Sequence, residues 1–166
     1  MGVDPFLLES RLMPSPDESS PEVRLQRGLR RAFPIYDYVG LEVESARDGI
    51  YRCFVPFRAS NMNHIATIHA AIQWAVSEVL GGLVMMSALE GEPFFGVVKK
   101  VTIEFKRPAR SGISAEALFD EGAAERLRAD FEGKGEAGFT LHAVVRDDQG
   151  VEVASAEAEY LVRRPR

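Results

Sequence analysis

The sequence has few residues of the kinds that build cross-links and metal sites. Cys53 is the single cysteine, so an intramolecular disulfide is excluded, and the composition suits a reducing compartment. The three histidines and one cysteine form no cluster with zinc-ligand spacing. We therefore expect neither a structural metal nor a disulfide framework.

The sequence also lacks an excess of positive charge. Its formal net charge is −5 at pH 7, from 20 basic and 25 acidic residues. General binding to nucleic acid requires a net basic face, because the ligand is a chain of phosphates. The composition argues against a nucleic-acid partner but leaves room for a local basic patch that binds a small phosphorylated ligand.

A secretory leader is not apparent. Asp4 places an acidic residue early, and the apolar run Phe6-Leu7-Leu8 is too short for a signal core. We expect a cytoplasmic protein.

Long apolar runs are limited to residues 70–89, in which Glu78 is the single ionisable side chain. The length would allow a membrane span, which needs about 20 apolar residues. However, scattered polar residues and the pair Gly81-Gly82 interrupt the run, and no basic flank follows. We therefore predict a buried core helix and no membrane partner.

The remaining composition fits one globular domain. The chain has 166 residues, of which 46% are hydrophobic and 27% are charged, enough for a sizeable core. Residues 14–21 are polar and punctuated by prolines, which predicts a flexible N-terminal segment over residues 1–21. The domain then covers residues 22–166 and starts with a short helix over residues 22–33, which Pro34 ends.

Strand and helix patterns follow one another through this domain. Apolar alternation and turn residues predict strands over residues 41–45, 50–57, 94–106, 113–119, 139–146 and 151–163. Helical patterns cover residues 69–88 and 122–132. In the third strand the alternation puts these residues on one face: Val97, Lys99, Val101, Ile103 and Phe105.

The last predicted strand carries a row of small residues, Ala154, Ala156 and Ala158, followed by Tyr160 and Val162. Such a row lets a bulky element approach closely, and the apolar helix is the natural candidate. An antiparallel sheet that curls round this helix would cover it on nearly all sides. The pattern therefore predicts an α+β hotdog fold, with about six strands wrapped round one long central helix.

The central helix also carries the residues with catalytic potential. Glu78 is an acid in an apolar helix, where burying an unpaired charge is costly. Its presence therefore suggests either a partner that compensates the charge or a functional role. His69 and Ala70 lie at the helix start, whose free N–H groups and dipole suit a developing negative oxygen. The small side chains of Ala70 and Ala71 leave that backbone open. Thioester hydrolysis needs these parts: a carboxylate, and donors for the oxyanion.

Helix geometry separates the two halves of such a site. Ala70 and Glu78 are eight positions apart, which is about 12 Å along the axis at about 1.5 Å per residue. A glutamate side chain cannot span that distance. Both groups can serve one carbonyl only if a second copy of the helix lies alongside, antiparallel, by two-fold symmetry. An enzyme of this kind must therefore be a homodimer, alone or as part of a dimer of dimers.

The run from Asn63 to Glu78 resembles the motif of hotdog acyl-CoA thioesterases of the phenylacetate-pathway (PaaI-like) type. In that family an Asn precedes a short loop with Gly-Thr, His-Gly-Gly opens the helix, and an Asp or Glu follows nine residues after the His. Asn63, Thr67, His69 and Glu78 match this register without gaps.

The resemblance covers about residues 35–163. The stretch of residues 101–110, with its Pro108-Ala109 pair, is similar to a strand of that family. Asp148-Gln149-Gly150 and the small-residue strand after it resemble a thioesterase-like branch still labelled as of unknown function.

The resemblance implies hydrolysis of an acyl-CoA, or another acyl thioester, to a free acid and a thiol. Glu78 would be the nucleophile or general base, and Asn63 would orient the attacking water or the substrate. The backbone N–H of Ala70, with His69 nearby, would form the oxyanion site of the other subunit. Thr67 and Ala71 would contribute to substrate binding.

A basic cluster offers a place for coenzyme A phosphates. Lys106, Arg107 and Arg110, with Lys99 and Lys100 close in sequence, would receive them, which would explain basic residues gathered in an acidic protein. The same residues also fit ordinary solvated strand ends. Coenzyme A would be part of the substrate, so neither a metal nor an organic cofactor is implied.

Three departures from the family pattern affect this region. Ala70-Ala71 replaces Gly-Gly, so two methyl groups narrow the pocket while the N–H groups remain. Ala66 replaces the glycine before Thr67, and alanine would be strained there if the position needs a positive φ. Residues 121–137 are an insertion relative to the simplest family members.

Other interpretations of the same residues stay open. Glu78 could be a structural acid paired with an arginine or a backbone group, and Asn63 could merely shape its loop. A hotdog dehydratase or hydratase would pair His64 with Glu78, although the Pro-Gly typical of such enzymes at the helix start is missing. A third alternative is a domain that binds acyl-CoA without catalysis.

Overall fold

The computed structural model describes residues 20–165. The elements are, in chain order, α2 (Pro21–Ala32), α3 (Pro34–Val39), β1 (Glu42–Arg47), β2 (Ile50–Val55), the 3₁₀ turn η1 (Ala59–Asn61), α4 (Ala70–Ala88), β3 (Phe95–Phe105), β4 (Ile113–Leu118), α5 (Glu121–Lys134), β5 (Glu136–Asp147) and β6 (Glu152–Arg163). The segment predicted to be flexible, residues 1–21, lies outside the described residues except for its last two.

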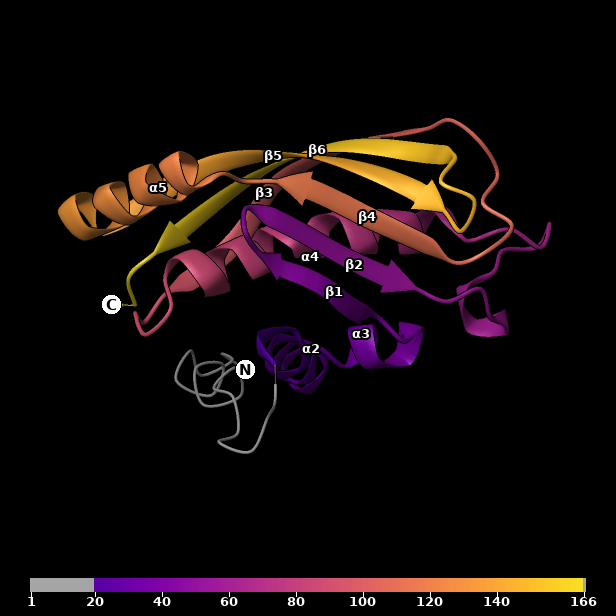
Figure 1. Cartoon of the computed structure of the whole chain (residues 1–166), viewed down its shortest axis with the longest axis horizontal. Helices are drawn as coiled ribbons and strands as arrows, with labels where there is room; N and C mark the ends of the chain where they lie inside the picture. The colour runs from indigo at the N-terminus through magenta and orange to yellow at the C-terminus, as the bar shows by residue number, and fades with distance from the viewer. Residues whose placement is uncertain (1–19, 166) are drawn as a thin grey trace.

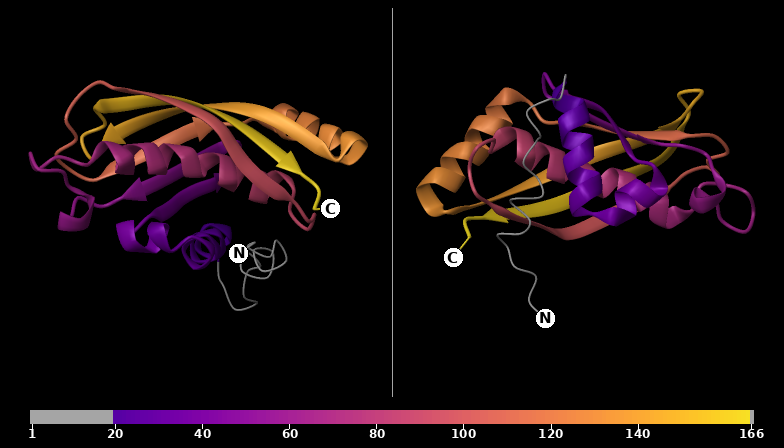
Figure 2. Two further views of the ribbon diagram at one scale, coloured as in Figure 1. Left: turned by 180° about the vertical axis from the view of Figure 1, so that it is seen from behind. Right: turned by 90° about the horizontal axis from the view of Figure 1, so that it is seen from below.

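The six strands form one antiparallel sheet in the order β1-β2-β4-β5-β6-β3. The sheet curls, and α4 lies along its concave side, between the strands and the N-terminal helices α2 and α3 (Figures 1 and 2). All six predicted strands and the central helix are present, so the α+β hotdog fold is confirmed.

Helix α4 is apolar nearly all round because the sheet surrounds most of it. Leu80, Leu83 and Val84 have no exposed surface, whereas Trp74 on the outer side is 39% exposed. Of the helices within residues 20–165, α4 alone is long and apolar enough to cross a membrane, and half of that stretch is buried inside the fold. The predicted core helix is thus confirmed.

The row of small residues on β6 faces α4, which packs against this strand. The three alanines of the row are buried, and Tyr160 is only 2% exposed. Gly81 of α4 lies against the Tyr160 ring, and a Cβ at this glycine would overlap the ring carbons. This close approach explains a glycine in the middle of a helix, where it costs about 1 kcal/mol relative to alanine.

The prediction that Val97 and Lys99 share a face of β3 with Val101, Ile103 and Phe105 is wrong. The pairing with β6 shifts between Val98 and Lys100, so Lys99 is the extra residue of a β-bulge. A bulge inverts the alternation of side chains on one side of it. Val98 therefore packs against the core in place of Val97, and the predicted residues beyond the bulge keep their common face.

One edge strand of the sheet is covered by a helix, and the other is open. Helix α2 covers the edge at β1, where Gln26 accepts the backbone N–H of Val43 at 2.9 Å and Arg30 donates to the carbonyl oxygen of Leu41 at 2.8 Å. Strand β3 pairs with β6 alone, and its other edge is open within the protomer. Phe105 at its end is 48% exposed. An open edge of this kind is a template for pairing with another chain.

The predicted flanking helices are present, with one addition. Ser20 caps α2, and Pro34 ends this helix but also opens α3, which the sequence pattern did not predict. Gly40 ends α3 in the left-handed conformation, with φ 68. The insertion forms α5, which runs from its N-cap Asp120 to Gly135 with φ 72.

Candidate active site

Glu78 lies near the middle of α4 and is held by two tyrosines. Its carboxylate Oε2 accepts the O–H of Tyr36, from α3, at 2.9 Å. The phenol of Tyr160, from β6, donates to the main-chain carbonyl oxygen of Glu78 at 2.8 Å. Within residues 20–165 no lysine, arginine or histidine forms an ion pair with Glu78. The interpretation of Glu78 as the partner of an arginine finds no support in this arrangement.

The surroundings of Glu78 perturb its ionisation. Burial raises the pKa of the carboxyl above its ordinary value, and the hydrogen bond from Tyr36 partly offsets this because it favours the charged form. Burial and the nearby carboxylate also raise the pKa of Tyr36 far above its ordinary value, so the phenol stays a donor. A carboxylate with a raised pKa is a stronger base than an exposed one, and such groups gather at functional sites.

The start of α4 presents backbone donors. His69 is the N-cap, and its Nδ1 accepts the N–H of Ala71 at 3.0 Å, which leaves the proton of the neutral ring on Nε2. The His69 carbonyl oxygen accepts the N–H groups of Ile72 and Gln73. The N–H of Ala70 forms no hydrogen bond with any residue from 20 to 165, and Ala70 is exposed. This amide is therefore available to an oxyanion.

Asn63 shapes the loop that leads into α4. Its side-chain oxygen accepts the N–H groups of Ile65 and Thr67 at 3.1 Å each, and its Nδ2 donates to the Thr67 hydroxyl at 2.8 Å. Ala66 at the tip has φ 56, so this position does adopt the left-handed conformation that favours glycine. The hydroxyl of Thr67, a residue only 4% exposed, is occupied by this bond. A contact of Asn63 or Thr67 with substrate stays a prediction.

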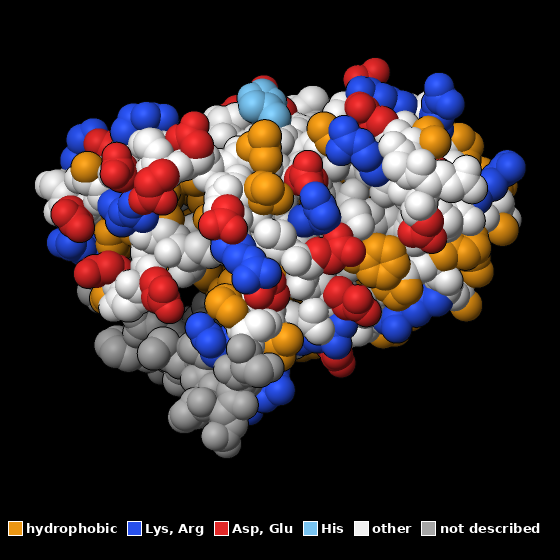
Figure 3. Space-filling view, in the orientation of Figure 1, with side chains coloured by type: hydrophobic (Ala, Val, Ile, Leu, Met, Phe, Trp, Pro, Cys, Tyr) orange, Lys and Arg blue, Asp and Glu red, His pale blue; other side chains and the backbone are white. Residues whose placement is uncertain are grey.

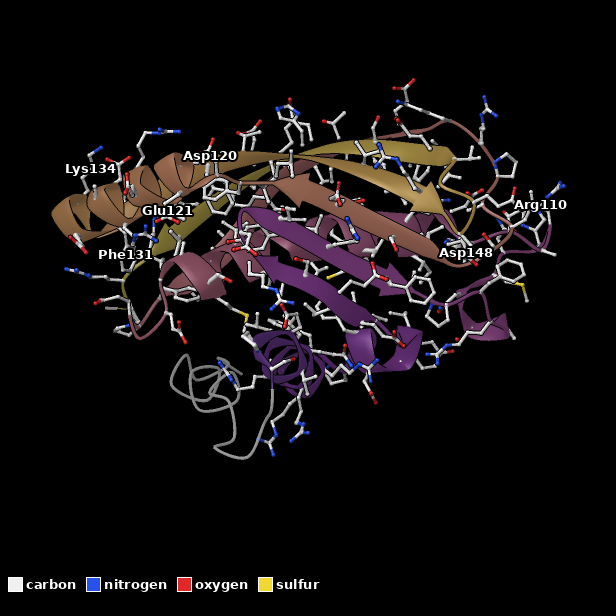
Figure 4. The ribbon with its side chains drawn as sticks, viewed as in Figure 1. Arg110, Asp120, Glu121, Phe131, Lys134 and Asp148 are labelled. Carbon is white, nitrogen blue, oxygen red and sulfur yellow. The ribbon has the colours of Figure 1, made fainter. Side chains whose placement is uncertain are left out.

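Two of the predicted basic residues lie close to the start of α4. The N–H of Ile68 donates to the carbonyl oxygen of Ala109 at 2.8 Å, which joins the loop before α4 to the segment that carries Arg107 and Arg110. Both arginines are exposed. Figure 4 shows Arg110 at this end of the molecule, opposite to α5.

The lysines of the predicted cluster are more dispersed. Lys106 forms an ion pair with Glu152, and Lys100 lies 3.7 Å from Glu159, both acids of β6. Figure 3 shows basic and acidic side chains interspersed on the face that it displays. The arginines beside the α4 start are therefore better placed than the lysines to receive a phosphate.

One protomer does not bring the two halves of the predicted site together. Ala70 and Glu78 lie on one continuous helix, about 12 Å apart along its axis. His64, which a dehydratase would pair with Glu78, lies on the exposed loop before α4. Glu78 has Tyr36 as its hydrogen-bond partner instead.

Tyr36 and Tyr160 are site residues that the sequence interpretation missed. Pro34 and Gly40 bracket the α3 segment as start and stop signals of a helix, and this signal was present in the sequence. The contact between Tyr36 and Glu78, in contrast, joins residues 42 positions apart. Periodicity carries no information about such a pair.

Other site types are not evident around α4. Residues 20–165 contain no group of three or more histidine, cysteine, aspartate or glutamate side chains that could hold a metal. An open cavity of about 640 Å³ lies at the far end of α4, lined by the β1–β2 turn, the last turn of α4 and the start of α5. Neither Glu78 nor Ala70 lines this cavity.

Comparison with known proteins places the chain in a family. No curated protein sequence matches the chain. The solved structure of a protein of unknown function from Pseudomonas aeruginosa, described as a probable thioesterase, is 30% identical with a TM-score of 0.76, over 91% of this chain and 97% of that one. A protein of unknown function from Chlorobaculum tepidum is 20% identical with a TM-score of 0.78, over 87% and 94% of the two chains. A thioesterase from Haemophilus influenzae is 12% identical with a TM-score of 0.65, over 89% and 93%.

The last two likenesses, at low identity, show the shared fold alone. The family described as a domain of unknown function, DUF4442, matches residues 22–162, from the first turn of α2 to the end of β6. The Pseudomonas aeruginosa relative is similar over nearly the whole of both chains. The chain therefore belongs to the DUF4442 family, and it shares the hotdog fold of solved structures that are described as thioesterases.

Proposed function

We propose that the protein is a homodimeric thioesterase that hydrolyses an acyl-CoA to a free acid and coenzyme A. The observation that carries this proposal lies on α4: a partly buried carboxylate, Glu78, and an unbonded amide at the helix start, Ala70. The description of the Pseudomonas aeruginosa relative as a probable thioesterase supports the same reaction. A reducing compartment, the cytoplasm, suits a chain whose single cysteine is free and buried.

The chemistry requires one proton to move twice. Glu78 takes a proton from water while the water oxygen attacks the carbonyl carbon of the thioester. The negative charge on the carbonyl oxygen is stabilised by the N–H of Ala70 of the partner subunit and by the dipole of that helix. The C–S bond then breaks, and Glu78 returns the proton to the departing thiolate. The products are an acid and a thiol, so the scheme uses no metal and no organic cofactor.

Two surfaces support the homodimer in this proposal. The first is the open edge of β3, which has room for a second strand. The second is the outer side of α4, where Trp74 lies one turn before Glu78 and is 39% exposed. Antiparallel packing of two α4 helices about a two-fold axis would bring each Glu78 to the partner's Ala70. A dimer of such dimers would leave both sites intact.

The coenzyme A part of the substrate would bind beside the start of α4. Arg107 and Arg110 are exposed there and would receive its phosphates. Ala71, also exposed, would border the thioester, and the alanine methyl groups would narrow the acyl pocket relative to Gly-Gly. Lys106 would contribute only by leaving its partner Glu152.

A mixed-dimer experiment tests the shared site. Glu78→Gln removes the carboxylate, and Ala70→Pro removes the amide hydrogen without breaking the helix. Proline suits the first helical position, and His69 before it is already extended, with φ −64 and ψ 142. Each variant alone should lose about 100-fold or more of kcat/KM. Mixed dimers should regain activity, because the Glu78→Gln protomer supplies Ala70 and the Ala70→Pro protomer supplies Glu78.

Turnover is measured as thiol release from a panel of acyl-CoAs, and the dimer by sedimentation. Mixed dimers as inactive as their parents would remove the shared site from the proposal. Tight acyl-CoA binding without thiol release from any member of the panel would indicate a non-catalytic binding domain. Hydration of an enoyl-CoA that disappears in His64→Ala would indicate the dehydratase alternative.

A further inference from the structure

The carboxylate of Glu78 has a partner from outside the predicted motif. Tyr36 precedes the motif by one strand pair, β1 and β2, and reaches Oε2 of Glu78 from α3. The other carboxylate oxygen, Oε1, forms no hydrogen bond with any residue that the structure describes. The two oxygens are therefore inequivalent: one is held, and the other is left for a reacting group.

The short helix that carries Tyr36 is fixed to the body of the protein. The carbonyl oxygen of Tyr36 accepts the N–H of Leu41 at 2.9 Å. The carbonyl oxygen of Val39 accepts Nδ2 of Asn61 at 2.9 Å, and Asn61 is fully buried. The ring of Phe33 packs edge-on against the ring of Tyr36, with centroids 5.7 Å apart. A side chain held in this way can fix the orientation of its partner.

Few ionisable groups act on this pair. Tyr160 of β6 approaches from the sheet, but its hydroxyl bonds the main chain of Glu78 rather than the carboxylate. Cys53 of β2 is a buried neutral thiol near Tyr36. Helix α4 itself carries no other ionisable side chain. The Tyr36 phenol is thus the group within residues 20–165 that most directly favours the charged form of Glu78.

We propose that Tyr36 is a positioning residue for Glu78, which holds Oε2 so that Oε1 faces the attacking water or the thioester. This inference rests on the function proposed above. A hydrogen bond that favours the carboxylate extends its ionised range to lower pH. Tyr36 therefore serves two ends: it orients the base, and it keeps the base charged despite burial.

The test compares two tyrosine-to-phenylalanine variants. Tyr36→Phe keeps the ring that packs on Phe33 and removes the hydroxyl from the carboxylate. Tyr160→Phe removes a hydroxyl that bonds the main chain of the same glutamate, so it is a control for a purely structural effect. The readouts are the acid-side midpoint of kcat/KM against pH, and the titration of the Glu78 carboxyl carbon followed by ¹³C NMR without substrate.

In Tyr36→Phe we expect both midpoints to move up by about one pH unit, because a carboxylate has lost a charge-assisted hydrogen bond. We also expect kcat to fall about tenfold with little change in KM. In Tyr160→Phe both midpoints should stay at the wild-type pH, whatever its melting temperature. Unmoved midpoints in Tyr36→Phe, with Glu78→Gln inactive, would overturn this inference alone. A fully active Glu78→Gln enzyme would overturn the proposed function and this inference with it, while the NMR titration would still report the hydrogen bond itself.

Discussion

Gly81 of α4 lies directly against the ring of Tyr160 on β6, and a Cβ at this glycine would overlap the ring carbons Cε1 and Cζ. The contact sets how closely the central helix approaches the sheet. It also holds the Tyr160 hydroxyl at the carbonyl oxygen of Glu78, three residues earlier in the helix. Gly81 therefore determines both the distance between α4 and the sheet and the position of the Tyr160 hydroxyl beside Glu78.

Gly81→Ala is expected to destabilise the protein. The added methyl group has no space, because a buried ring stands in its way, and overpacking of this kind costs about 1–3 kcal/mol. At the neighbouring Gly82 a Cβ would meet no other atom within 4 Å, so Gly82→Ala is the matched control. Gly82→Ala should be neutral or stabilising by up to about 1 kcal/mol. Denaturant unfolding at one protein concentration compares the two, and equal effects would contradict the packing argument.

Glu78→Gln is expected to stabilise the fold at neutral and alkaline pH while it removes activity. Burial raises the folded-state pKa of Glu78, so between the unfolded-state pKa and this raised pKa the unfolded chain binds fewer protons than the folded one, and the free energy of unfolding falls as the pH rises. Above the raised pKa the full penalty remains. Below the ordinary glutamate pKa of about 4.3 the carboxyl is protonated in both states and the penalty vanishes. The melting temperature of the variant should exceed that of the wild type at pH 8, and the difference should shrink towards pH 4. A difference that is constant with pH would exclude the burial penalty as its cause.

A single turnover in ¹⁸O-water is expected to label the product acid. If Glu78 activates water, the water oxygen enters the product directly. Nucleophilic attack by Glu78 would form an anhydride, and water that adds to the Glu78 carbon of this anhydride would leave a Glu78 oxygen in the product and the label in the enzyme. The experiment uses excess enzyme over acyl-CoA and mass spectrometry of the acid. An unlabelled first product, with label in the enzyme, would assign the nucleophilic role to Glu78.

Arg110→Glu is expected to raise KM for an acyl-CoA about three- to tenfold, because the reversed charge would oppose a phosphate. A thioester of N-acetylcysteamine with the same acyl group lacks the phosphates, so its KM should not change. Lys134→Glu makes the same charge reversal on α5, at the opposite end of the molecule (Figure 4), and serves as the control. If Arg110→Glu changed KM equally for the acyl-CoA and for the N-acetylcysteamine thioester, Arg110 would not be a phosphate-binding residue.

Cys53 is expected not to react with Ellman's reagent in the native protein. Its side chain is fully buried in β2, and burial raises the pKa of its thiol, so little thiolate forms. Denatured protein should react with one equivalent, because the chain has one cysteine. The thiol-release assay should therefore have no background from the enzyme. Rapid reaction of native protein would show that this strand opens readily.

Much of the fold was predictable because it depends on local periodicity. The run of residues 70–89, with one ionisable side chain, could only be a core helix or a membrane span, and the alternating segments around it required a sheet. The alanine row of β6 predicted the close approach that Gly81 and Tyr160 make. The bulge at Lys99 was not predictable, since one extra residue in a strand leaves no mark on composition.

The site divides in the same way. The sequence by itself determined that Glu78 is a lone acid in an apolar helix and that it stands too far from Ala70 to serve the same carbonyl, because helical rise depends only on residue number. Only the tertiary structure decided which group holds the carboxylate. The partner is Tyr36 of α3, 42 residues earlier in the chain, and it meets Glu78 because the tertiary fold brings α3 within hydrogen-bond distance of α4. Contacts of that kind arise from chain topology, which no local pattern encodes.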